Sequence, residues 1–554
     1  MRQSRPVLVL IITLLMFSGC GGYSQIDPAL DQGQNWGKAS QKAFYQTSQG
    51  SQIIRYGWFV ALEQPNSTDL FLADQLTRFG YLPDPFSSSA DYNPEHLPVG
   101  FVRDDDEDEK GAWVGMTCAA CHTSELEFKG KTYRIDGGPT DADFFKFISE
   151  LSESLLKTAK NDAKFARFAA RIEGQSESFG TKYNGTDLRV DLKKEAERFK
   201  GFVTRSTPDQ PWGKARLDAV TLILNEVGYH LVPDKKNLKV PNAPVSYPFL
   251  WDTHQQPRVQ WNGISSGELS RNTTEVLGVF AKFDPADPST NTVQLGNLMD
   301  LEDLVEQLRS PKWKDFNFID NISDAERAKR LEAGAVLYKE RCQSCHDVNE
   351  REEDQVSTVM VVLNPVDDSV EPVRKIGEDL SPINTDPAMA MDFYNRKLIV
   401  KQGKEPKTAL KALGSVLPKV WLKSFYAFLV GVFQELFGES AEEVRVYKAR
   451  PLNGVWATAP YLHNGSVPNM MELLKPVDAA DPKDRRVDKF CVGSREFDPV
   501  NLGFESSLDT NGSCGDNFLF DTTIPGNRNM GHDYDNASLS TDDRLAIIEF
   551  IKWE

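Results

Sequence analysis

Two short runs of one pattern constrain this chain more than any other feature. The first is Cys118-Ala119-Ala120-Cys121-His122 and the second is Cys342-Gln343-Ser344-Cys345-His346. This spacing lets two thiols add across the two vinyl groups of one porphyrin, while the adjacent imidazole binds the iron. The alternative is a zinc ribbon built from the two cysteine pairs, but it leaves both histidines without a role. We therefore expect two covalently attached haem c groups, with His122 and His346 as iron ligands.

The N-terminus has the pattern of an export signal. Two arginines precede an apolar run over residues 7–17 that ends in Ser-Gly-Cys20. The run is too short to cross a bilayer comfortably, and the glycine before Cys20 resembles the lipobox of bacterial lipoproteins. We expect residues 1–20 to be a lipoprotein-type signal peptide. Gly21, which follows the cysteine, resembles the residue that directs lipoproteins to the outer membrane. The expected location is the periplasmic side of the bacterial envelope, as an outer-membrane lipoprotein. Because Phe17 stands where an aliphatic residue is usual, secretion without a lipid anchor is the alternative.

The remaining cysteines are consistent with an oxidising compartment. The chain has 7 cysteines, and Cys491 and Cys514 are left after Cys20 and the four haem-attachment positions. Exported proteins form disulfides readily, so we predict that this pair is bridged, with two free thiols as the alternative.

The charge of the chain excludes one class of partner. A net charge of −18 argues against nucleic-acid binding. An acidic surface can attract a basic electron carrier, and a solvated face is the alternative explanation of the charge excess. A small cytochrome or cupredoxin is the expected electron donor. The acidic run over residues 104–109 predicts an exposed loop.

Helix signals define a C-terminal cytochrome c domain with an insertion, residues 321–554. Ser323 and Glu326 form a capping box at the start of a helix that runs into the second haem motif. Ser540 caps a last helix that continues to Trp553. An apolar stretch over residues 416–437 predicts a buried helix, with a surface that dips into lipid as the alternative.

The N-terminal haem domain with its extensions is expected over residues 21–320. After the first haem motif, residues 126–135 are strand-like, and helical periodicity runs from 142 to 172. The predicted fold class is mainly α: two cytochrome c-like haem lobes with long loops and insertions and few short strands.

The sixth ligand of each iron decides what the irons do, because an iron with two protein ligands passes electrons and an open one binds small molecules. His532 ends a glycine-rich loop, Gly-Asn-Arg-Asn-Met-Gly-His, just before the closing helix. A side chain at that position can reach the edge of a haem. A solvated side chain is the alternative for His532, and Met530 is a competing ligand.

Residues 448–468 contain Thr-Ala-Pro-Tyr-Leu-His463-Asn-Gly-Ser, which resembles a segment of the bacterial di-haem cytochrome c peroxidase superfamily. The Asn-Met-Gly-His532 loop and residues 114–138 resemble its rubber oxygenase branch most. The resemblance implies two facing haem lobes, with the C-terminal haem relaying electrons and the N-terminal haem doing the chemistry. It makes His346 the proximal and His532 the distal ligand of the C-terminal iron, where classical peroxidases use methionine. His463 would be a structural or propionate-side residue.

The distal side of the N-terminal haem is expected within residues 247–263, which are rich in aromatic and hydrogen-bonding side chains. The candidates are His254 or Gln260 to steer a proton, Arg258 to polarise the O–O bond, and Trp251 or Trp261 to relay an electron. An aromatic core loop is the alternative. The sequence identifies no glutamate that matches the acid–base residue of classical peroxidases.

Three functions follow from this pattern. We favour an enzyme that reduces hydrogen peroxide at the N-terminal haem with electrons passed through the C-terminal haem. A dioxygenase of a hydrophobic, polyisoprenoid-like substrate and a pure electron-transfer protein are the alternatives.

Overall fold

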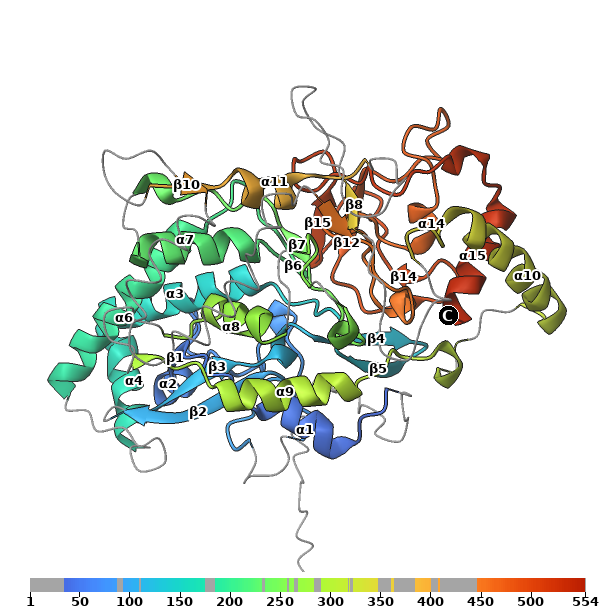
Figure 1. The fold of residues 1–554 in the computed structure, drawn as a ribbon. Helices are drawn as coiled ribbons and strands as arrows, with labels where there is room; N and C mark the ends of the chain where they lie inside the picture. Colours follow the sequence, from blue (N-terminus) through green and yellow to red (C-terminus); the bar gives the residue numbers. More distant parts are fainter. Residues whose placement is uncertain are drawn as a thin grey trace, which may run out of the picture.

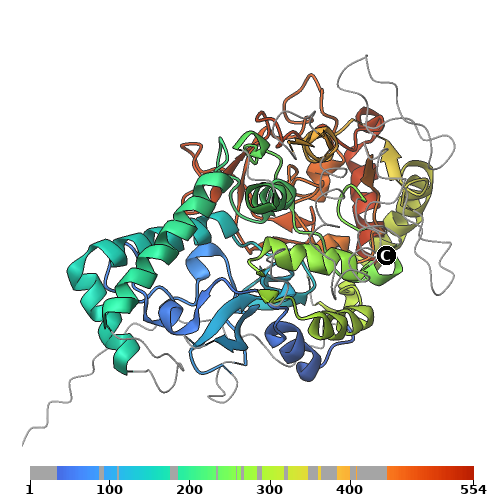
Figure 2. The same cartoon turned by 60° about the vertical axis from the view of Figure 1, so that its left-hand side comes forward.

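The computed structural model describes residues 34–86, 93–108, 111–174, 185–231, 235–256, 259–263, 268–282, 290–316, 318, 322–346, 360–362, 384–399, 407–408 and 446–553. Within these ranges, helices and short strands are joined by long irregular segments. Figures 1 and 2 show one group of N-terminal helices at one end of the molecule and the C-terminal elements at the other.

The N-terminal group surrounds a small antiparallel sheet. The sheet has the order β1 (Ile54–Arg55), β3 (Gly111–Met116) and β2 (Phe101–Asp108). The helices nearby are α1 (Lys38–Gln46), α2 (Tyr56–Ala61), α3 (Phe144–Lys160), α4 (Asp162–Gly174) and α6 (Gly185–Ser206). The apolar faces of α2, α3, α4 and α6 form a core with the sheet, and this core includes the fully buried Phe101, Phe147 and Phe199. The buried residues of α1, Phe44 and Tyr45, belong to a second core.

The acidic run is a strand for most of its length. Asp104 pairs with Trp113 and Asp108 with Gly111, so the prediction of a loop is wrong over residues 104–108. The backbone partners that β3 offers outweigh the low strand preference of aspartate. Asp104 itself is buried and accepts a hydrogen bond from Gln294 Nε2 at 3.0 Å.

The first haem motif is held between strands. β3 ends at Met116, and the Thr117 side chain caps a single turn, η2 (Cys118–Ala120). The predicted strand at 126–135 is a hairpin of β4 (Thr123–Phe128) and β5 (Lys131–Asp136). Gly100 has φ +76 and lies against the turn, where a Cβ would come within 2.0 Å of Ala120 N. Only glycine therefore fits at this position.

Further α-helices and short strands are described in the N-terminal half. They are α7 (Ala219–Leu231), α8 (Glu268–Gly278), α9 (Leu295–Gln307), β6 (Arg216–Leu217) and β7 (Val245–Ser246). Short strands and helices make up most of the rest. These are β8 (Met360–Val362), α11 (Ala388–Asn395), β9 (Lys397–Leu398), β10 (Lys407–Thr408), β11 (Val446–Lys448), α14 (Met470–Leu473), β12 (Lys489–Val492), β13 (Phe497–Asp498), β14 (Gly503–Phe504) and β15 (Phe518–Asp521).

The second haem motif is carried by a helix pair. Helix α10 (Asp324–Arg341) packs along α15 (Thr541–Trp553), as Figure 1 shows at the C-terminal end. Both predicted caps are confirmed, since Ser323 Oγ accepts from Glu326 N at 3.2 Å and Ser540 Oγ accepts from Asp543 N at 3.1 Å. Cys342 is the C-cap of α10, so the helix leads directly into the motif.

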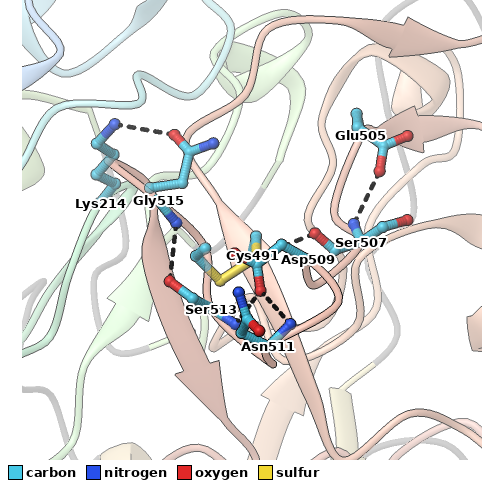
Figure 3. The surroundings of a disulfide bond; sticks show 10 residues. Lys214, Cys491, Glu505, Ser507, Asp509, Asn511, Ser513 and Gly515 are labelled. Atoms are coloured by element: carbon cyan, nitrogen blue, oxygen red, sulfur yellow. Dashed lines mark hydrogen bonds between the residues drawn. A yellow bond between two sulfur atoms is a disulfide. The ribbon is translucent and has the colours of Figure 1, made fainter.

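The predicted disulfide between Cys491 and Cys514 is confirmed, with a Cα–Cα distance of 5.4 Å. Figure 3 shows the loop that it closes. Within that loop, Asp509 Oδ1 accepts from the backbone N–H groups of Asn511 and Ser513 at 2.8 Å each.

In the parts of the chain that the structure describes, no helix is long and apolar enough to cross a membrane. Residues 1–20, predicted to be a signal peptide, and the apolar stretch over residues 416–437 lie outside the described residues.

Candidate haem sites

The second haem motif opens into the larger of the two cavities that lie beside the haem motifs. Cys342, Cys345, His346 and His532 all line it, and its empty space, open mouth included, is about 1600 Å³. The lining from the surrounding elements is largely apolar and includes Met470, Leu473, Leu539, Ile547 and Ile551. Such a space suits a large, flat, apolar group.

His346 is oriented to bind a metal at the other side of its ring. Its Nδ1 lies 2.6 Å from the backbone oxygen of Arg450. A carbonyl only accepts, so Nδ1 carries the proton and Nε2 keeps its lone pair.

His532 faces His346 at the distance that one shared iron requires. The two ring centroids are 6.2 Å apart, with an interplanar angle of 26°. Two imidazoles on one metal, with bonds of about 2.0 Å, place their ring centroids roughly 6.3 Å apart. Met530 is half-buried and is not among the lining residues of the cavity. The geometry therefore fits His532, rather than Met530, as the partner of His346.

The His532 loop is held by hydrogen bonds to its backbone. His532 has φ +59, a conformation that non-glycine residues adopt only with support. Arg486 donates to the carbonyls of Asn529, Gly531 and His532, and Asn536 Nδ2 donates to His532 O at 2.8 Å. Burial lowers the pKa of His532 to about 3, so the imidazole is neutral, which is the form that binds a metal.

The motif at residues 458–466 supports the same loop from the other side. Asn464 Nδ2 donates to the carbonyls of Gly526 and Arg528 at 3.1 Å each. His463 is buried against Tyr447, with ring centroids 4.1 Å apart, and lines the cavity. Burial lowers the pKa of His463 to about 3. This placement suits the structural role that the sequence predicts for His463.

The first haem motif has the same orientation of its histidine. His122 Nδ1 lies 2.8 Å from the backbone oxygen of Pro248, which leaves Nε2 available. Burial lowers the pKa of His122 to about 4. Cys118 and Cys121 are free thiols, as are Cys342 and Cys345. Both motifs thus present two thiols and one neutral imidazole, the set that haem c attachment needs.

A smaller cavity, with about 370 Å³ of empty space, faces His122. Two of its polar residues come from α8, which the sequence analysis missed: Arg271 and Glu275. Gln260 Nε2 donates to Glu275 Oε1 at 3.1 Å. Burial raises the pKa of Glu275. The only sequence signal was the Arg271–Glu275 spacing of four, which places both on one helix face.

The structure brings together part of the predicted distal set. Gln260 and Trp261 line the smaller cavity. Trp251 is fully buried behind it, with its ring 4.5 Å from that of Phe249 and its Nε1 donating to Asn453 O. His254 lies in the turn η4 (Thr253–Gln255) and is not among the lining residues, while Arg258 lies outside the described residues.

The two cavities have a wall in common, which we call the shared wall. It consists of Pro248, Phe249, Trp261, Lys448 and Arg450, which line both cavities.

The zinc alternative finds no support in the geometry. Cys342 and Cys345 line the larger cavity, whereas Cys118 and Cys121 pack against the two hydrophobic cores. Over the described ranges, no group of three or more His, Cys, Asp or Glu residues is placed to hold a metal ion.

Comparison with known proteins supports the haem interpretation. Residues 446–482 match the family model described as RoxA-like, cytochrome c-like. The chain is 28% identical over 607 aligned residues to the uncharacterized protein y4iJ of Sinorhizobium fredii (strain NBRC 101917 / NGR234), covering 96% of this chain and 94% of that protein. It is 23% identical over 338 residues to the uncharacterized protein y4iM of the same strain, covering 57% of this chain and 63% of that protein. The family match supports haem c binding and a redox function related to RoxA-like cytochromes. It does not bear on the peroxidase superfamily specifically.

Proposed function

We propose that this protein is an exported di-haem c-type enzyme that reduces hydrogen peroxide at the N-terminal site with electrons that pass through the C-terminal site. A haem held by Cys118, Cys121 and His122 would supply the redox chemistry of peroxide reduction at the N-terminal site. A haem held by Cys342, Cys345, His346 and His532 would supply electron relay at the C-terminal site.

The observation that carries the peroxidase assignment is Glu275. Its carboxyl group lies in the cavity that faces His122, its orientation is fixed by Gln260, and burial raises its pKa. A carboxyl group of raised pKa can take a proton from one peroxide oxygen and return it to the other, so that two electrons and two protons yield two waters. Arg271 adds positive charge to the same cavity, which favours negative charge on the oxygen that leaves.

The shared wall gives electrons a short route between the sites. Trp261 lines both cavities, and its Nε1 donates to Ser246 O at 2.8 Å, which fixes the ring. Of the two tryptophans that the sequence offers as a relay, Trp261 is therefore the one we assign.

We assign the protein to the periplasmic side of the bacterial envelope, anchored through a lipid on Cys20, with a small cytochrome or cupredoxin as electron donor. The net charge of −18 supports a basic donor.

A dioxygenase of a hydrophobic, polyisoprenoid-like substrate is the second candidate. The observation in its favour is the match of residues 446–482 to the RoxA-like model. The carboxyl group of Glu275 and the guanidinium of Arg271 in the smaller cavity favour peroxide over such a substrate.

The test compares two activities of the purified holoprotein: peroxide turnover with a reduced small cytochrome, and oxygen uptake with a polyisoprenoid. We expect peroxide turnover, and we expect Glu275→Gln to reduce kcat/KM by about 10²–10⁴-fold, the usual value of general acid–base catalysis. Glu306→Gln, an exposed carboxylate on α9, is the matched control and should retain full activity. Oxygen uptake with the polyisoprenoid and no peroxide turnover would establish the second candidate. The absence of both activities would favour a pure electron-transfer protein.

A further inference from the structure

Arg450 is a buried cation without an anion. Its side chain is 6% exposed, and neither Nε nor Nη1 has a hydrogen-bond partner. Among the residues that the structure describes, no carboxylate forms an ion pair with it, and Asp252 acts on it only from a distance. A buried guanidinium with two unused donors is costly unless a negative group completes the site.

The guanidinium belongs to both cavities. It stacks on Phe249, with Cζ 3.7 Å from the ring centroid, and Trp261 lies 5.6 Å away. Arg450 therefore lies within the shared wall, between the two cavities. Arg271 is a second buried cation of the smaller cavity, and its Nη1 also lacks a hydrogen-bond partner.

Arg450 also connects the supports of the two proximal histidines. Its backbone oxygen lies 2.6 Å from His346 Nδ1, and its Nη2 donates to Phe249 O at 2.6 Å. Phe249 directly follows Pro248, whose oxygen lies 2.8 Å from His122 Nδ1. A single residue thus touches the structures that orient both iron ligands.

We infer that Arg450 binds a propionate carboxylate of haem at the shared wall and acts as a positioning residue that sets the reduction potentials of both haems together. The chemistry is that of a guanidinium and a carboxylate, which form charge-assisted N–H···O bonds, and Nε and Nη1 of Arg450 are the donors without a partner. A positive charge near an iron favours its reduced form, so the loss of this charge lowers the potential. The inference rests on haem attachment at both motifs, which is part of the proposed function, and is independent of the peroxidase reaction.

The experiment is a redox titration of the holoprotein, followed by absorbance and electron paramagnetic resonance to separate the two irons. We expect Arg450→Gln to shift both midpoint potentials downwards. Arg341→Gln is the matched control, because Arg341 lines the larger cavity and is not among the lining residues of the smaller one. It should leave the N-terminal potential unchanged. If Arg450→Gln leaves either potential where it is in the unaltered chain, the inference is overturned.

A second variant carries the test if Arg450→Gln does not fold. Arg450→Lys keeps the charge, but a buried ammonium loses its proton at a lower pH than a guanidinium. Both midpoint potentials should then fall more steeply with rising pH in Arg450→Lys than in the unaltered chain, and equal slopes would overturn the inference. Pyridine haemochrome quantification comes first, because fewer than two haems in the unaltered chain would contradict the proposed function itself.

Discussion

Replacing Gly334 with alanine should weaken the contact between α10 and α15 that positions the second haem motif. A Cβ at this position would lie 2.2 Å from the carbonyl oxygen of Ala546 and 2.8 Å from Cβ of Phe550. Because a backbone carbonyl on a helix cannot turn aside, the two helices must separate. Overpacking of this kind costs about 1–3 kcal/mol.

The same substitution also favours the helical conformation of α10. The sign of the change in the free energy of unfolding therefore depends on which effect is larger. Glycine in a helix interior is less favourable than alanine by roughly 0.5–1 kcal/mol. The net loss in the free energy of unfolding for Gly334→Ala is therefore up to about 2.5 kcal/mol. The midpoint temperature falls by about 1 °C per kcal/mol, because the unfolding entropy is about 2.1 cal/mol/K per residue over 554 residues.

Gly296→Ala is the matched control for this prediction. Gly296 lies near the start of α9, and a Cβ there would meet nothing within 4 Å. Helix preference then acts alone, and this variant should be as stable as the unaltered chain or more stable. Thermal unfolding by circular dichroism at matched haem content measures both. A Gly334→Ala midpoint at or above that of Gly296→Ala would refute the reasoning.

Three further predictions concern the ligand, the disulfide and one buried acid. His532→Ala should convert the low-spin signal of the C-terminal iron to high spin in electron paramagnetic resonance; an unchanged spectrum would assign the ligand elsewhere. The two cysteines of the disulfide are 23 residues apart in the sequence, so Cys491→Ser should lower the free energy of unfolding, measured with denaturant, by about 3 kcal/mol. Reductant should then no longer change the stability. Burial raises the pKa of Asp218 from 3.8 to about 6, so the folded chain binds this proton more tightly than the unfolded chain. The associated stability, up to roughly 3 kcal/mol, is present below pH 4 and is lost as pH rises through 6, and Asp218→Asn should flatten that part of the stability curve; an unchanged curve would contradict the assignment.

Local signals in the sequence predicted the C-terminal helices well. The caps at Ser323 and Ser540 depend on side chains three residues apart, and the structure contains both. The pairing of Cys491 with Cys514 followed from counting, because the other cysteines had a role. Short segments or elimination decide these features, so a single sequence is enough to predict them.

Long-range placement could not be predicted in the same way. The acidic run at residues 104–108 becomes a strand because β3 pairs with it, and composition alone does not reveal that partner. Glu275 lies in α8, far along the chain from His122, and only tertiary structure places it in the same cavity. Conversely, Trp251 and His254 belong to the predicted distal segment but are not among the residues that line the cavity with Gln260 and Trp261.

The two candidate haem sites belong to one packed body. One hydrophobic core includes Trp36 and Trp251 from the first half together with Trp456 and Ile551 from the second. Neither half could bury this surface alone, and the exposed apolar area would destabilise either fragment. The supports of His122 and His346 then meet within that same body, at Pro248, Phe249 and Arg450. A change at one proximal histidine is therefore expected to reach the other through a rigid, packed contact rather than through solvent.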